Sequence, residues 1–553
     1  MTSGHINRRR LLMTAALAGG ASVSGLGGAA SAAARDADRD DHDLVVSTRY
    51  GRLRGERSGA VRAFKGIPYA APPVGARRFR SPEAPRPWHG VREATALGHP
   101  CVQNNPDFPA WLDPEPESED CLYLNVWTPA RRGHGARPVM VWFHGGIFSF
   151  GSAGAPVYDG ARLADVADAV VVSVNHRLNI FGYLWLGDII PELAAHATPG
   201  QRDLVAALRW VRDNIAAFGG NPRNVTIFGE SGGGAKVGSL LATPSARGLF
   251  HKAIIQSGSQ LAVLPRERAT GAASAALEAL GGGKFTLDRL QKLSSQDLKD
   301  AARTVEGAMS FQPVVDGRFM PEQTWKDGAP VDSRGIPMMI GTNSHEAVLF
   351  LSEMTQPIGT DTELKRRFST SGFQPPGMTD RQLDELVSVY RNAMPSGTRL
   401  ELLIAMVTDV FMWHSALVQA EHKLADPKAS DPVYFYEFAW RTPCFGSSWA
   451  LHAGELPFVF GNLTYPTAWD GKDDDAIRTA DDPRGLRFVL AEQMMRAWGA
   501  FAHDGNPSTA ELRWPEYNTV DRPTMVFDRG SSTVVHDRNG TRRRIIQQFP
   551  TVW

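Results

Sequence analysis

The feature that most constrains this chain is the sequence around Ser231. Residues 225–228 form a short apolar run typical of a buried strand, and Gly229-Glu230-Ser231-Gly232-Gly233 follows without a gap. This is the one G-x-S-x-G in the sequence. A strand that turns sharply into a helix at this spacing pushes the serine hydroxyl out of the sheet, and the glycines leave room for the turn. The N–H groups that begin the helix would face any negative charge formed there. The motif therefore indicates a nucleophilic serine.

Apolar runs alternate with helical patterns on both sides of this motif. Residues 139–143, 170–174 and 253–255 are further short apolar runs. Residues 202–218 predict a helix, because one face carries an apolar residue at spacings of three and four: Leu204, Leu208, Val211, Ile215 and Phe218. This alternation predicts an α/β fold with a large, mostly parallel central sheet and helices on both faces. Chemistry in such sheets lies at the carboxyl ends of the strands.

The composition of the chain narrows the classes of partner. The 553 residues include 59 Lys+Arg and 59 Asp+Glu, with 42% hydrophobic residues, as in ordinary globular proteins. A balanced charge supplies no field that would attract nucleic acid or an anionic membrane. No H-E-x-x-H motif is present, and no cysteine pair has zinc spacing, so we expect neither a metal nor another cofactor. Residues 229–236 lack the final Gly-Lys-Ser/Thr of a phosphate-binding loop.

The N-terminus has the pattern of an export signal. Residues 1–34 contain no acid, carry Arg8-Arg9-Arg10 before Leu11-Leu12, and end in a run of small residues. The pattern is similar to a twin-arginine signal and predicts a secreted or periplasmic protein. A membrane anchor is the less favoured reading, because glycines dilute the apolar run. We predict a flexible charged leader over residues 35–43, and no later segment able to span a membrane.

A serine nucleophile requires a general base and an acid that orients it. In a fold of this kind the chain order is serine, acid, histidine. Seven histidines follow the serine, and spacing alone does not choose among them: His251, His345, His414, His422, His452, His503 and His536.

Three long segments resemble the type-B carboxylesterase/cholinesterase family of α/β-hydrolases. They are residues 62–75, 118–126 and 218–233, in the family's order, and the resemblance covers nearly all of residues 44–520. It implies one α/β-hydrolase domain over residues 44–553. It also implies that Glu346, at the end of Gly341–Glu346, is the acid of a catalytic triad, although Ala347 stands where the family often has glycine. His452, at the start of a segment similar to the family's histidine segment, would be the base for Ser231.

The resemblance assigns the oxyanion hole to the N–H groups of Gly146, Ile147 and Gly232, with Gly145 as a supporting residue. Ile147 departs from the family, which has a small residue there. A β-branched residue resists positive φ, so we expect negative φ at Ile147, with its side chain crowding the substrate cavity. Gly232 replaces a residue that is more often alanine, and we expect little consequence.

Further residues have roles implied by the resemblance. Glu230 is either a buried carboxylate that supports the site or a structural part of the turn. Trp111 and Phe148 are candidate pocket residues, although for Trp111 packing is favoured over stacking on a cationic substrate.

The resemblance also implies a disulfide between Cys101 and Cys121, which leaves Cys444 as a buried thiol. The basic run 542–544 is expected to be a solvated end rather than a binding patch.

The sequence thus predicts a serine carboxylesterase that acts on a small-molecule ester, with no nucleic-acid partner and no stable membrane insertion. Its oligomeric state stays open. Acyl transfer, or hydrolysis of an amide, a carbamate or a polymer ester, uses the same residues and stays open too. A non-catalytic binding protein is less favoured, because Ser231, Glu346 and His452 are all present. Since the base must be neutral, we expect the rate to fall as the pH drops toward and below about 6.5.

Overall fold

The computed structural model describes residues 44–103, 116–131, 135–305, 310–352, 354, 356–428, 430–464, 475–530 and 532–552. Contacts divide the chain into two units, Met1–Val45 and Val46–Trp553, and the second unit is described here. The predicted signal and leader lie outside the described residues, as does Trp111.

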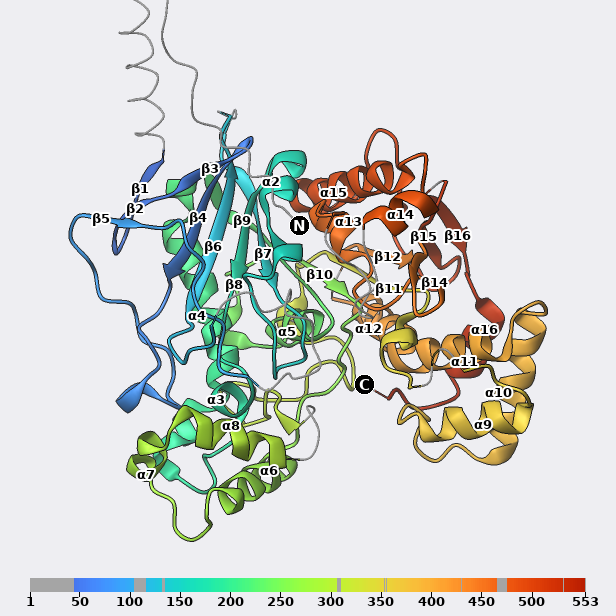
Figure 1. Ribbon diagram of the computed structural model, residues 1–553, viewed down its shortest axis with the longest axis horizontal. Helices are drawn as coiled ribbons and strands as arrows, with labels where there is room; N and C mark the ends of the chain where they lie inside the picture. The colour runs from blue at the N-terminus through green and yellow to red at the C-terminus, as the bar shows by residue number, and fades with distance from the viewer. Residues whose placement is uncertain are drawn as a thin grey trace, which may run out of the picture. The chain divides into compact units, whose positions relative to one another are not determined.

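An eleven-stranded sheet forms the centre of this unit (Figure 1). Its order is β16-β15-β12-β11-β10-β9-β7-β8-β6-β4-β3. The strands are β3 (Glu56–Ser58), β4 (Val61–Pro68), β6 (Tyr123–Pro129), β7 (Arg137–Phe143), β8 (Val170–Val174), β9 (Gly220–Glu230), β10 (Lys252–Gln256), β11 (Met338–Asn343), β12 (Val433–Phe438), β15 (Pro523–Phe527) and β16 (Thr533–His536). From β8 to β15 all neighbours are parallel, while antiparallel pairs lie toward both edges. The predicted mostly parallel sheet is confirmed.

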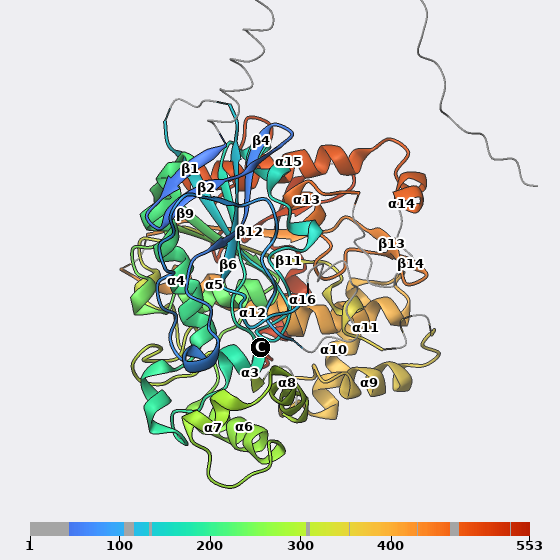
Figure 2. The ribbon, with the colours of Figure 1, turned by 60° about the vertical axis from the view of Figure 1, so that its left-hand side comes forward.

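Both faces of the sheet are buried, and strand β7 shows how. Val139, Val141 and Phe143 pack into one hydrophobic core, whereas Met140 and Trp142 pack into another. This is the alternation of a strand covered on both sides. The first core contains α4 (Pro199–Asn214), α5 (Gly232–Leu240) and α12 (His414–Ala425), and the second contains α2 (Ala161–Ala167), α13 (Leu456–Phe460) and α15 (Leu486–Asp504). The two sets of helices are visible in Figures 1 and 2.

The predicted helix over residues 202–218 is present but begins earlier and ends in a tighter turn. Helix α4 begins at Pro199, whose fixed φ suits the first turn, and η5 (Ile215–Phe218) continues it as a 3-10 helix. All five apolar residues used for the prediction are buried. Gly219 then ends the helix at φ 84°, and β9 starts at once.

Two groups of helices are inserted after the carboxyl ends of strands β10 and β11. Between β10 and β11 come α6 (Arg266–Ala279), α7 (Leu287–Lys292) and α8 (Ser295–Thr304). Between β11 and β12 come α9 (Asp361–Thr370), α10 (Asp380–Ala393) and α11 (Arg399–Thr408), followed by the π-helix η10 (Asp409–Trp413) and α12. The remaining elements are β1 (Val45–Thr48), β2 (Gly51–Arg54), β5 (Val91–Glu93), α3 (Asn179–Tyr183), β13 (Thr442–Cys444), β14 (Ser447–Trp449), α14 (Asp475–Asp481) and α16 (Gly540–Ile546).

Helices α11, η10 and α12 run on as one helix from Arg399 to Ala425. By length and composition alone this helix could cross a membrane, judged over its most apolar 18-residue window. The expectation that no segment after the N-terminus has this character is therefore wrong. However, 83% of that window is buried inside the protein, which is how the core helix of a globular domain meets the same criterion.

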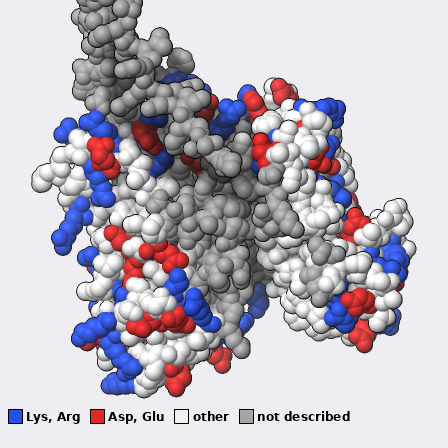
Figure 3. Space-filling model, viewed as in Figure 1, with Lys and Arg blue, Asp and Glu red and all other residues white. Residues whose placement is uncertain are grey.

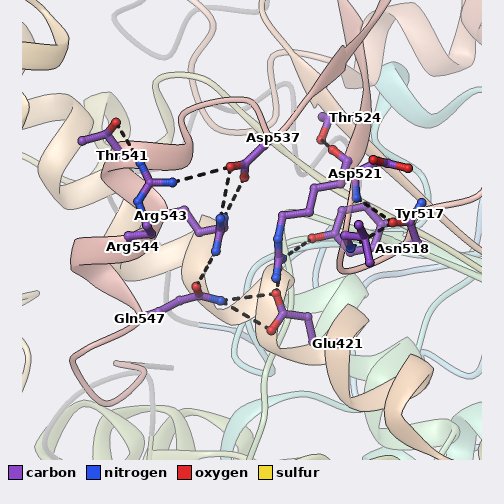
Figure 4. A network of polar contacts seen from close by, with 12 residues as sticks. Glu421, Tyr517, Asn518, Asp521, Thr524, Asp537, Thr541, Arg543, Arg544 and Gln547 are labelled. Atoms are coloured by element: carbon purple, nitrogen blue, oxygen red, sulfur yellow. Dashed lines mark hydrogen bonds and ion pairs between the residues drawn. The ribbon is translucent and has the colours of Figure 1, made fainter.

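The basic run at the C-terminus also differs from expectation. Arg542 forms a two-pronged ion pair with Asp409 of η10, and its side chain is largely buried. Arg543 donates hydrogen bonds to Asp537 and Gln547, and Gln547 in turn donates to Glu421 of α12 (Figure 4). These contacts attach α16 to the long helix. Only Arg544 fits the expected solvated end, because Arg542 pairs with Asp409 far away in the sequence and Arg543 is held by its neighbours Asp537 and Gln547.

Lysine, arginine and acidic side chains are interspersed over the described part of the face shown in Figure 3. This distribution agrees with the balanced net charge of the chain.

Cys101 and Cys121 are buried free thiols, so the disulfide is not formed in this structure. Burial raises the pKa of Cys121 well above its usual value, and the neighbouring Cys101 adds to this shift. Cys444 is buried, as expected.

Candidate active site

Ser231 lies on a strained turn between β9 and α5. Its backbone has φ 55° and ψ −125°, a conformation that is costly for a residue other than glycine. A Cβ atom on Gly233 would lie 2.0 Å from Phe143 O, and one on Gly229 would lie 2.5 Å from the carbonyl carbon of Gly233. Neither position can carry a side chain. The predicted strand, turn and helix are therefore confirmed, and the two glycines are required by close packing.

His452 and Glu346 form a buried hydrogen-bonded pair. Glu346 begins the short η9 helix (Glu346–Leu349) just after β11, and His452 precedes α13. The Nδ1 atom of His452 lies 2.6 Å from Glu346 Oε2. The other carboxylate oxygen of Glu346 accepts hydrogen bonds from Ser257 Oγ at 2.5 Å and from Asn343 N–H at 2.6 Å. A carboxylate held in this way fixes the orientation of the imidazole. Sequence reasoning missed Ser257, because no local motif marks it.

The opposite ring nitrogen of His452 faces Glu230. Nε2 lies 3.2 Å from Glu230 Oε1, and both side chains are buried. Among the described residues Ser231 Oγ has no hydrogen bond to His452. Catalytic hydrogen bonds are often long in a site without substrate and shorten when one binds. Glu230 thus contacts the imidazole on the ring nitrogen opposite to the one that faces Glu346.

Three buried carboxylates gather around this imidazole. Burial raises the pKa of Glu230 well above its usual range, and the neighbouring Glu455 and Glu346 add to this. Glu455 is held by Asn343 and Gln256, which donate to its oxygens. Burial lowers the pKa of His452, but the charges of Glu230 and Glu346 outweigh burial and raise this pKa to about 9. The site therefore stabilises the protonated imidazole.

The oxyanion segment has a conformation that the sequence did not predict. Gly146 has φ 83° and Ile147 has φ 54°, so the expected negative φ at Ile147 is wrong. The reason is the approach of this loop to the start of α5: a Cβ atom on Gly232 would lie 2.2 Å from Ile147 N. Glycine at 232 leaves room for the backbone of residue 147 to pass this close, so the expectation of little consequence is wrong too. Within the described residues, the N–H groups of Gly146 and Ile147 donate no hydrogen bond.

Gly145 precedes Gly146 and Ile147 in this loop and lies beside Glu230. A Cβ atom at Gly145 would lie 3.1 Å from Glu230 Oε2 and 3.5 Å from Ser231 Cβ. Its backbone therefore lies close against the turn that carries Ser231.

Lys236 is a second residue that sequence reasoning missed. It lies on α5, is fully buried, and donates to His144 O at 2.9 Å and to Ile147 O at 2.7 Å. Burial lowers its pKa well below the usual value, while Glu230 opposes that shift. The available signal was a lysine at a helix position where neighbours on all sides are small or apolar.

Aromatic side chains gather beside His452. The ring of Phe350 lies 4.9 Å from the imidazole and 5.2 Å from Phe411, which η10 presents, and Phe373 lies 4.4 Å from Phe411. Phe350 is 36% exposed despite its size. Phe148, by contrast, is fully buried and packs on Tyr183 at 4.9 Å.

In the described part of the chain, no three His, Cys, Asp or Glu side chains are grouped so that they could hold a metal ion.

The profile of the Carboxylesterase family matches residues 42–545. The chain belongs to this family. Para-nitrobenzyl esterase of Bacillus subtilis is 36% identical to it over 516 residues, which cover 92% of this chain and 99% of that protein. Human carboxylesterase 5A is 34% identical over 513 residues, covering 86% of this carboxylesterase and 84% of the relative.

Solved structures agree with the carboxylesterase fold. A PNB esterase structure has a TM-score of 0.77 at 36% identity, covering 92% of this chain and 100% of that one. A Geobacillus stearothermophilus carboxylesterase has a TM-score of 0.76 at 37% identity, covering 91% and 100%. The protein is a carboxylic-ester hydrolase with an α/β-hydrolase fold, as the sequence predicted.

Proposed function

We propose that this carboxylesterase hydrolyses its ester through an acyl-enzyme on Ser231. The observation that carries the proposal is the 2.6 Å bond between His452 and the buried Glu346, beside a serine on a strained strand-to-helix turn. This bond leaves Nε2 of the neutral imidazole as the proton acceptor.

In the first half-reaction, Ser231 Oγ attacks the ester carbonyl carbon while His452 Nε2 takes the hydroxyl proton. The carbonyl oxygen becomes an oxyanion and accepts hydrogen bonds from the N–H groups of Gly146, Ile147 and Gly232. The tetrahedral intermediate then collapses, and His452 gives its proton to the leaving alcohol oxygen. Glu346 stays ionised and stabilises the imidazolium in between.

In the second half-reaction, water attacks the carbonyl carbon of the acyl-enzyme. His452 takes a proton from this water and returns it to Ser231 Oγ as the carboxylic acid leaves. Over both half-reactions, one ester and one water are converted into one alcohol and one carboxylic acid.

For the substrate class, we propose esters with an apolar or aromatic alcohol. His452 protonates the leaving alcohol, so groups next to its ring contact that part of the substrate. Phe350, Phe373 and Phe411 form such a group. One relative is named for a para-nitrobenzyl ester, which is of this class.

A hydrolysis panel tests both proposals. The wild type and Ser231→Ala would be compared on p-nitrophenyl esters from acetate to palmitate, and on benzyl and ethyl esters of one acid. We expect turnover in the wild type alone, with benzyl preferred over ethyl, and a loss of that preference in Phe350→Ala. Activity retained by Ser231→Ala would contradict the mechanism, and an equal rate for ethyl esters would contradict the alcohol subsite. Adding a second alcohol or an amide to the panel separates hydrolysis from acyl transfer and amidase activity.

We further propose export of the chain through the twin-arginine pattern of residues 1–34, followed by pairing of Cys101 with Cys121. The arginines without any acid in the first 34 residues support export, and the contact between the two buried thiols supports the pairing. N-terminal sequencing of the protein from the cell exterior, with thiol alkylation before and after reduction, tests both. An uncut N-terminus in the cytoplasm, or alkylation of Cys101 and Cys121 before reduction, would contradict them.

A further inference from the structure

Lys236 is a buried charged residue whose described partners are backbone carbonyls. Its Nζ atom donates to His144 O and Ile147 O and lies 5.5 Å from the centre of the Phe148 ring. Among the described residues it forms no ion pair, although Glu230 is near enough to affect its pKa. Burying an ammonium group is costly unless its hydrogen bonds are satisfied by the protein. The two carbonyls are therefore central to why a lysine is stable at this position.

The two carbonyls bracket the oxyanion segment. His144 O belongs to the peptide that leads into Gly145, and Ile147 O belongs to the peptide that leads out of Ile147. One side chain thus holds the peptides on both sides of the Gly145-Gly146-Ile147 segment. The peptide between Gly146 and Ile147 is held separately, since Gly146 O accepts from Ser149 N–H at 3.1 Å and Phe150 N–H at 3.2 Å.

The segment needs such support because its conformation is unfavourable. Gly146 and Ile147 are both at positive φ, which a β-branched side chain resists. The backbone of Ile147 also lies against Gly232, where even one added carbon would collide. A loop that can relax from this arrangement would turn the N–H groups of Gly146 and Ile147 away from the substrate.

We propose that Lys236 is a positioning residue that clamps the oxyanion loop, holding the Gly146 and Ile147 N–H groups toward the carbonyl oxygen of the ester. This role rests on the proposed function. Because the oxyanion forms only in the transition state, losing the clamp lowers kcat far more than it weakens substrate binding. Loss of a single oxyanion donor costs about 10²–10³ in kcat, which bounds the effect of losing the clamp.

The test compares Lys236→Met with a matched control, Lys423→Met. Lys423 lies on α12, is also buried, and donates to the backbone oxygen of Ser333 and to Asp431. We expect Lys236→Met to lower kcat on p-nitrophenyl acetate by about 100-fold, with KM changed less than about threefold. Lys423→Met lowers the unfolding temperature but leaves kcat within about twofold. Equal losses of kcat in the two variants, or a loss confined to KM, would overturn the proposal.

A second arm tests the link to Ile147. Glycine accepts positive φ readily, so in an Ile147→Gly background the loop needs its clamp less. We expect Lys236→Met to cost about 10-fold less in kcat there than in the wild-type background. Strictly multiplicative effects would show that Lys236 does not act through this residue.

Two further measurements test the clamp if Lys236→Met does not fold or if the wild type hydrolyses no ester. If Lys236→Met does not fold, Lys236→Gln retains a donor and is compared with Lys423→Gln, with the same expected split between kcat and KM at about 10-fold. If the wild type hydrolyses no ester, the proposed function fails, and the rate of Ser231 phosphonylation by a p-nitrophenyl phosphonate then replaces kcat. An unchanged phosphonylation rate in Lys236→Met would refute the clamp independently.

Discussion

The imidazole of His452 lies between two buried carboxylates, with Nδ1 2.6 Å from Glu346 and Nε2 3.2 Å from Glu230. The first contact orients the ring, whereas the second lies on the nitrogen that exchanges a proton with Ser231 and substrate in the proposed mechanism. Each negative charge favours the protonated ring. A base that is readily protonated is a stronger acceptor but is neutral over a narrower range of pH.

This relationship predicts the pH dependence of the reaction. The carboxylates raise the pKa of His452 to about 9, and only the neutral imidazole accepts the serine proton. We therefore expect kcat/KM to fall as the pH drops through this range, higher than the 6.5 expected for an ordinary histidine. Glu230→Gln removes the negative charge that Glu230 carries once it is ionised, which lowers the pKa of His452 and moves the acid limb to lower pH. Rates measured by product chromatography across the pH range would show the shift, and Glu492→Gln on the exposed side of α15 is the control. An acid limb that stays in place in Glu230→Gln would contradict this account.

Ser257 is predicted to support the acid of the triad. Its hydroxyl donates to Glu346 at 2.5 Å, and Ser257→Ala removes one of the two donors to that oxygen. A hydrogen bond to a charged group contributes about 1.5–3 kcal/mol, so we expect kcat to fall by about 10-fold with little change in KM. Ser259→Ala is the matched control, because this serine is equally buried and its hydroxyl has no partner among the described residues. Equal kcat values for the two variants would show that Ser257 does not support Glu346 in the reaction.

Gly232 and Ile147 are predicted to depend on each other. A methyl group at position 232 would collide with Ile147 N, so Gly232→Ala displaces the oxyanion loop and should lower kcat by at least about 10-fold. Ile147→Gly frees the loop to move, and the double variant should recover most of that loss. Kinetics of the two single variants and the double variant give the coupling. Additive losses would mean that the two residues act separately. Ile147→Gly alone is expected to widen the range of accepted esters, and an unchanged substrate profile would count against that.

Arg542 is predicted to stabilise the attachment of α16. Among the described residues, Arg542→Met leaves buried Asp409 with the Tyr390 hydroxyl as its one remaining hydrogen-bond partner, and breaking a buried pair costs about 3 kcal/mol. Urea unfolding would detect this as a lower midpoint. Arg544→Met, at an exposed position of the same helix, should change stability by less than about 0.5 kcal/mol. Similar midpoints for the two variants would support the original expectation that residues 542–544 form a solvated end.

The parts of the fold that follow from local sequence were predictable. Each of these parts is encoded by residue spacing within a single segment. They are the strand before Ser231, the glycines around it, and the amphipathic face from Leu204 to Phe218. The parallel sheet followed from the alternation of such segments. Choosing His452 among seven histidines required the family resemblance, because the partner of a histidine is set by tertiary structure.

The remaining features depend on contacts between distant segments. The positive φ of Ile147 arises where its loop meets Gly232, and local preference argued for the opposite sign. From sequence alone Lys236 would be expected at the surface, because its two carbonyl partners lie about 90 positions away in the chain. Arg542 likewise finds Asp409 across 133 positions. Physical rules for one segment cannot anticipate such pairs.

The central claim, an acyl-enzyme on Ser231, is tested most directly by trapping that intermediate. The wild type and Ser231→Ala would be mixed with p-nitrophenyl acetate, quenched in acid during turnover, digested and analysed by peptide mass spectrometry. The account predicts one acetyl group on the peptide that contains Ser231 in the wild type, and none on the corresponding peptide of the variant. Acetylation of another residue during turnover, or turnover of this ester by Ser231→Ala, would contradict it.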